Sequence, residues 1–227
     1  MERRLPPEYD GWQSHELAFR RMTTPELVLE IQDGPPARRL AALSVIDLTE
    51  VAPDTIADWI RALPDAEANE LAGAIPAQRP RASCSEDLRW VEVARLGYER
   101  RRLPTFLVML FSSLEAMEAR GCPETQLAWQ NIGDWLGEMY DRLVKSGDED
   151  SMGDVSLFVF ENYLNRDSIF ESLCGLICRH EDLAREVSSN PSVYLASLSE
   201  QDQRTALLEA ESAGGLPFSQ SWAALQE

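Results

Sequence analysis

The chain has 227 residues, of which 44% are apolar, so it can fill a folded core and is not a disordered protein. Its 39 acidic residues outnumber its 21 basic residues and give a formal net charge of −18. A chain of this charge repels a phosphate backbone, which argues against a nucleic-acid-binding protein. The acidity is uneven, because residues 1–120 hold 15 basic and 20 acidic residues, whereas residues 121–227 hold 6 and 19.

Helix signals follow one another through the first eighty residues. The segment 24–33 begins with Thr-Pro-Glu, a typical helix start, and ends at the Asp-Gly-Pro-Pro turn. A second helix is expected over 36–51, where apolar residues recur at three- and four-residue spacing. Prolines at the starts of 53–63 and 64–75 predict two further short helices.

The middle of the chain holds a break and then the most apolar helix. Residues 76–84 contain two prolines and no apolar periodicity, so they predict a loop or a subdomain boundary. A helix is expected from Ser85 to the arginine cluster at 100–102, and Pro104 ends it. The following run, 106–111, is apolar on all sides and therefore predicts a central core helix.

The second half also reads as helical. The clearest amphipathic helix spans 123–147, and Gly133 and Gly137 within it predict a close approach by another helix. Residues 155–164 mix strand-like and helical spacing, and helices on both sides favour a helix. Further helices are expected over 167–190, over 199–212 and around Trp222.

These segments predict an all-α protein of about ten short to medium helices, in a compact bundle or an irregular HEAT-like arrangement. Residues 24–63 resemble a HEAT-type helical repeat: the segment 29–43 is followed by a second helix with Ile56, Trp59, Ile60 and Leu63. The resemblance covers about 40 residues and has no clear second copy. It implies a surface that binds other proteins. We expect an N-terminal HEAT-like subdomain over 1–80 and an acidic helical subdomain over 81–227, packed as one unit.

Two clusters suggest metal chemistry without completing a site. Cys174 and Cys178 share a helix face near His180, but a closed zinc site needs a fourth ligand and usually Cys-x2-Cys spacing, so buried apolar cysteines are favoured. The acidic run 148–154 resembles a calcium loop only superficially, since Met152 and Val159 fall where ligands are required. We therefore expect neither a metal nor a cofactor.

Catalytic motifs are not evident either. The sequence has no Gly-rich phosphate loop, no Gly-x-Ser-x-Gly elbow and no His-Glu-x-x-His motif, and its two histidines lie in no nucleophile pattern. A non-catalytic protein is expected, and a carboxylate- or metal-dependent enzyme remains the further alternative.

Targeting signals are equally scarce, because no apolar segment follows the N-terminal arginines and no run approaches the length of a membrane span. These features, and four cysteines read as reduced thiols, predict a cytoplasmic protein with no membrane partner.

The acidic second half is the best pointer to function. Complementary charge speeds encounter with a basic protein and rejects wrong partners. The leading hypothesis is a binding protein for a basic partner, most concretely a bacterial immunity or inhibitor protein that neutralises a toxin; a HEAT-like scaffold is the alternative. The residues expected to bind the partner are three aromatic anchors and six acids: Trp129, Trp135, Tyr140, Glu138, Asp141, Asp148, Glu149, Asp150 and Asp154.

Overall fold

The computed structural model describes residues 6–74 and 83–226, and within them every regular element is a helix, as the sequence predicted. The expected boundary loop over 76–84 lies largely outside the described residues. By its internal contacts the chain forms two compact units, Met1–Cys122 and Pro123–Glu227, here called unit 1 and unit 2. No helix in the described ranges is long and apolar enough to cross a membrane.

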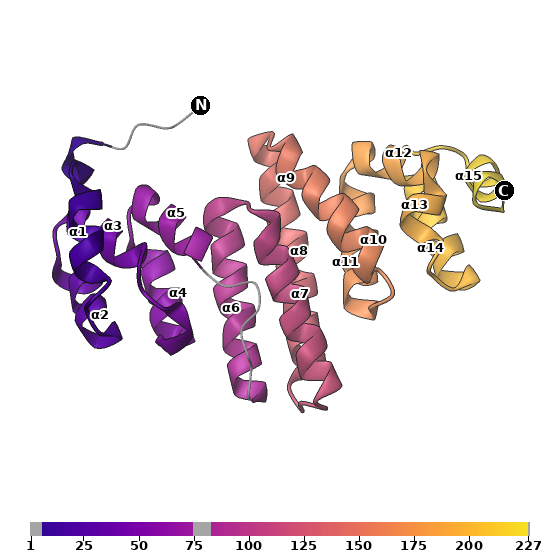
Figure 1. Ribbon diagram of the computed structural model, residues 1–227. Helices are drawn as coiled ribbons and strands as arrows, with labels where there is room; N and C mark the ends of the chain where they lie inside the picture. Colours follow the sequence, from indigo (N-terminus) through magenta and orange to yellow (C-terminus); the bar gives the residue numbers. More distant parts are fainter. Residues whose placement is uncertain (1–5, 75–82, 227) are drawn as a thin grey trace. The chain divides into compact units, whose positions relative to one another are not determined.

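Unit 1 is built from short helices that lead into a long helical hairpin (Figure 1). Its elements are η1 (Pro7–Tyr9), α1 (Trp12–Phe19), α2 (Thr24–Asp33), α3 (Pro36–Leu43), η2 (Leu48–Glu50), α4 (Pro53–Ala62), α5 (Asp65–Ala74), α6 (Cys84–Arg101) and α7 (Pro104–Ala119). The helix expected over 36–51 is thus two elements, because the chain leaves the helix after Leu43 and makes only a short 3-10 turn before Val51.

The hairpin of α6 and α7 holds the largest buried side chains of unit 1. Trp90 and Tyr98 of α6 and Phe111 of α7 are at most 1% exposed. Gly97 lets the two helices meet, since a Cβ there would lie 2.3 Å from the Phe106 ring. Val108 is 47% exposed, so the 106–111 run is buried on most but not all of its faces.

A buried ion pair ties three elements of unit 1 together. Glu67 of α5 is fully buried, and its two carboxylate oxygens accept hydrogen bonds from Nε and Nη2 of Arg39 at 2.8 and 2.9 Å. The Tyr9 hydroxyl of η1 donates to the same carboxylate at 3.0 Å. Burial, and then this bond to Glu67, raise the pKa of Tyr9 to about 12, so the phenol stays a neutral donor.

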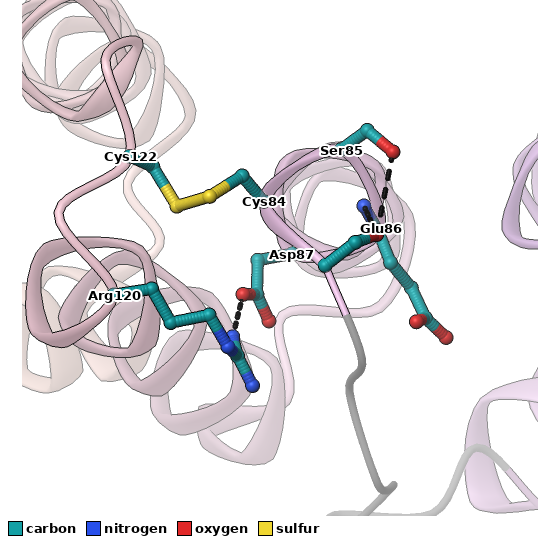
Figure 2. The surroundings of a disulfide bond; sticks show 7 residues. Cys84, Ser85, Glu86, Asp87, Arg120 and Cys122 are labelled. Carbon is teal, nitrogen blue, oxygen red and sulfur yellow. Dashed lines mark hydrogen bonds and ion pairs between the residues drawn. A yellow bond between two sulfur atoms is a disulfide. The ribbon is translucent and has the colours of Figure 1, made fainter.

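A disulfide closes the open end of the hairpin (Figure 2). Cys84 begins α6 and Cys122 follows α7, and their Cα atoms are 5.6 Å apart. The prediction of reduced thiols is therefore wrong for this pair, because antiparallel packing brings together two cysteines 38 residues apart in sequence. Asp87, fully buried one turn into α6, forms an ion pair with Arg120 beside the disulfide.

Unit 2 is a second set of packed helices. Its elements are α8 (Thr125–Ser146), α9 (Glu149–Asp154), the π-helix η3 (Val155–Phe160), α10 (Glu161–Tyr163), α11 (Asp167–Arg179), α12 (Glu181–Ser189), α13 (Pro191–Leu195), α14 (Glu200–Ser212) and α15 (Phe218–Gln226). The ambiguous segment 155–164 is helical, as expected. The helix predicted over 167–190 is instead broken at His180, whose backbone is extended.

Candidate functional site

The three aromatic residues expected to anchor a partner are buried. Trp129 and Trp135 are 6% exposed, and Tyr140 is 5% exposed. The Arg166 guanidinium lies over the Trp129 ring, with its Cζ 4.9 Å from the ring centre. They lie on the buried stripe of α8 that also holds Ile132, Leu136 and Met139, so they offer little surface for anchoring a partner.

The six acidic residues predicted to bind the partner differ in their surroundings. Glu138, Glu149 and Asp150 are exposed. The half-buried Asp148 accepts a hydrogen bond from the Ser151 backbone N–H at 3.2 Å, so it caps the N-terminus of α9. The remaining two, Asp141 and Asp154, are also half-buried. Burial, and then the charges of the neighbouring acids Asp150 and Asp148, raise the pKa of Asp154.

An open groove of about 890 Å³ runs between α8 and α11. The two helices touch at Gly133, where the Ser172 hydroxyl donates to the Gly133 carbonyl at 2.6 Å. A Cβ at Gly133 would lie 2.6 Å from the Ser168 carbonyl oxygen, so the predicted close approach is confirmed at this glycine. At Gly137 a Cβ would meet only Arg179, at 3.9 Å, so this glycine leaves open space in the groove.

The groove is lined by four carboxylates and a single guanidinium. The acids come from both helices: Asp134, Glu138 and Asp141 lie on α8, and Glu171 lies on α11. The basic residue is Arg179, at the end of α11. Because like charges line both sides, the groove favours a cationic ligand over an anionic or neutral one.

Asp141 orders the end of the groove. Its Oδ1 lies 2.7 Å from His180 Nε2 and accepts a hydrogen bond from Arg179 Nε at 3.3 Å. Burial alone would raise the pKa of Asp141, but its hydrogen bonds with His180 and Arg179 outweigh burial and lower it. The carboxylate therefore stays ionised near neutral pH and holds the Arg179 side chain beside it.

A second cavity, of about 370 Å³, lies where α11 turns into α12 at His180. Arg179 lines both this cavity and the groove, so the two are adjacent. The lining of this second cavity comes from α8, α9, η3, α11 and α12, and it includes Tyr140, Glu149 and Glu186. Glu149 and Tyr140 thus line a cavity, whereas Glu138 and Asp141 line the groove.

The cysteine pair forms no metal site. Cys174 and Cys178 are free thiols, and the Cys178 thiol donates to Glu209 Oε2 at 3.0 Å. This bond and, to a lesser degree, burial raise the pKa of Cys178, while burial raises that of Cys174 to about 12. Within the described ranges no cluster of three or more His, Cys, Asp or Glu side chains is placed to hold a metal ion.

Sequence reasoning missed the pairing of α8 with α11 across the groove. Three residues that line the groove, Asp134, Glu171 and Arg179, are not among the predicted partner-binding residues. The signal was present, because Asp134, Glu138 and Asp141 recur at four- and three-residue spacing beside Gly133 and Gly137. Comparisons with family models, with curated proteins and with solved structures find no match to this chain.

Proposed function

We propose that the protein is a non-catalytic binding protein whose acidic groove in unit 2 binds a basic protein partner. The observation that carries this proposal is the lining of the α8–α11 groove, where four carboxylates face one guanidinium that Asp141 already neutralises. Gly137 also lines the groove, and it leaves space there because a Cβ at this position would meet only Arg179, at 3.9 Å.

The most concrete form of this function is an immunity or inhibitor protein that neutralises a basic toxin. An acidic face can occupy the surface that a toxin uses for a phosphate-bearing substrate, and steering by complementary charge gives fast capture. Because Trp129, Trp135 and Tyr140 are buried, the proposal depends on the groove acids and not on an aromatic anchor. A cytoplasmic site of action remains a prediction, and the Cys84–Cys122 disulfide removes the support that reduced thiols lent it, since such bonds are typical of oxidising compartments.

Charge reversal in the groove tests the proposal. The variant Glu138→Arg with Glu171→Arg changes one exposed acid on each wall of the groove. The matched control, Asp33→Arg with Glu115→Arg, makes the same change in net charge at two exposed acids of unit 1. In affinity capture from the native host, a basic protein should be retained by the wild type and the control and lost from the groove variant.

The same experiment can also refute the proposal. Equal retention by the groove variant, or retention that does not fall as salt rises, would refute an acidic-groove mechanism. Loss from the unit 1 variant alone would favour the scaffold alternative, in which the N-terminal helices bind the partner.

A further inference from the structure

The wall of the cavity beside His180 has an apolar part and an acidic part. The cavity volume of about 370 Å³ is near the lower end of the range for ligand pockets, roughly 300–1,000 Å³. One part of its wall is apolar and comes from three elements, through Val144 of α8, Met152 of α9 and Leu183 of α12. Such a wall suits the aliphatic stem of a long side chain.

The charged part of the wall carries negative potential that the cavity does not neutralise. Glu149, Glu181, Asp182 and Glu186 all line it. Of these, Glu181 and Asp182 both pair with Arg185, and Glu186 accepts a hydrogen bond from the Tyr194 hydroxyl. Glu149 makes no ion pair with the described part of the chain. The one arginine in the lining, Arg179, is engaged with Asp141, which belongs to the groove.

Two buried polar side chains complete the cavity. Tyr140 is 5% exposed and Ser156 is 3% exposed, and their two hydroxyl groups are hydrogen-bonded to each other. Burial raises the pKa of Tyr140, so the ring stays neutral and adds no charge of its own. An aromatic ring in an acidic, partly apolar cavity adds attraction for a cation.

We propose that this cavity takes one arginine side chain of the basic partner, with its stem against Val144, Met152 and Leu183 and its guanidinium facing Glu149 and Glu186. The inference rests on the proposed function and names what the partner inserts next to the groove. Arginine fits better than lysine because acids on separate helices face the cavity, and a planar guanidinium presents five donors to them at once. Arginine is also enriched among the residues that dominate interface affinity.

The test uses small probes and the full-length chain. N-acetyl-arginine amide is titrated against protein carrying 13C-methyl methionine, with N-acetyl-citrulline amide as the uncharged isostere. The Met152 methyl signal, assigned through Met152→Leu, should shift saturably with the arginine probe, at a Kd on the order of 1 mM, and should not shift with citrulline. Glu149→Gln should weaken the arginine probe about tenfold, while Asp134→Asn, an equal charge change in the groove, leaves its affinity within about twofold.

Three results would overturn the inference: no saturable shift, an equal shift with citrulline, or equal weakening by Asp134→Asn. If Glu149→Gln disturbs α9, Glu186→Gln supplies the same comparison from α12. The two proposals fail separately. If the probe does not bind but the groove-dependent capture of a basic partner is intact, only the proposed arginine site is refuted. If the probe binds but capture does not depend on the groove, the proposed function is refuted.

Discussion

Removing the Cys84–Cys122 disulfide should destabilise unit 1 strongly. The bond closes a loop across 38 residues, which contains both helices of the α6–α7 hairpin. In the chain-entropy account, a closed loop of this length restricts the unfolded chain enough to stabilise the folded state by about 4 kcal/mol at 25 °C. The double variant Cys84→Ser with Cys122→Ser should lose that amount, and the wild type should lose it on reduction.

Hydrogen exchange in increasing urea can measure this loss for each unit separately. Peptides from α6 and α7 should open at lower urea in the double variant, whereas peptides from α8 and α11 should be unchanged. The exposed Cys178→Ser variant is the matched control and should leave both sets unchanged. Equal protection of α6 and α7 with and without the bond would refute the claim that the disulfide stabilises the hairpin, and four free thiols in oxidised protein would refute the bond itself.

Four further substitutions test the packing and the charges of the two units. Glu67→Gln breaks the ion pair between the fully buried Glu67 side chain and the part-exposed Arg39, and urea denaturation should show a loss of about 3–5 kcal/mol in the free energy of unfolding. A loss below about 1 kcal/mol would contradict this ion pair. Gly133→Ala should lower the free energy of unfolding by roughly 1–3 kcal/mol, because the new methyl group clashes with the α11 backbone. Gly137→Ala should raise it by about 0.5–1 kcal/mol. Equal melting temperatures for the two variants would contradict the groove geometry. The pKa of Asp154 is raised in the folded protein, so its ionised form opposes folding once the pH exceeds that pKa. Asp154→Asn should therefore raise the free energy of unfolding by up to about 0.5 kcal/mol at pH 7 and leave it unchanged at pH 3. Stabilisation at pH 3 and none at pH 7 would contradict this expectation.

The helical class followed from local signals, whereas two features of the candidate site did not. Prolines and three- to four-residue apolar spacing marked most of the helix starts and the core stripes. The break at His180 carried no such mark, because neither proline nor glycine stands there, yet this break forms the α11–α12 cavity. Trp135 lies on the apolar stripe of α8, so its place among the predicted partner-binding residues was inconsistent with the amphipathic pattern of that helix.

The disulfide shows a different limit of sequence reasoning. Cys84 and Cys122 become neighbours only because α6 and α7 have similar lengths, 18 and 16 residues, and fold back at the Leu103-Pro104 break. That relation belongs to the hairpin and to neither helix alone. The number of cysteines in a chain carries no information about which of the thiols meet.

The charge on the two walls of the α8–α11 groove should control the affinity for the basic partner. Binding of the captured basic partner is compared by calorimetry, at low and at physiological salt, for wild type, Glu138→Arg with Glu171→Arg, and Asp33→Arg with Glu115→Arg. We expect the affinity for the partner to fall as the salt concentration rises, to be lost in the groove variant and to be kept in the unit 1 variant. Salt-independent affinity that is the same in all three proteins would contradict it.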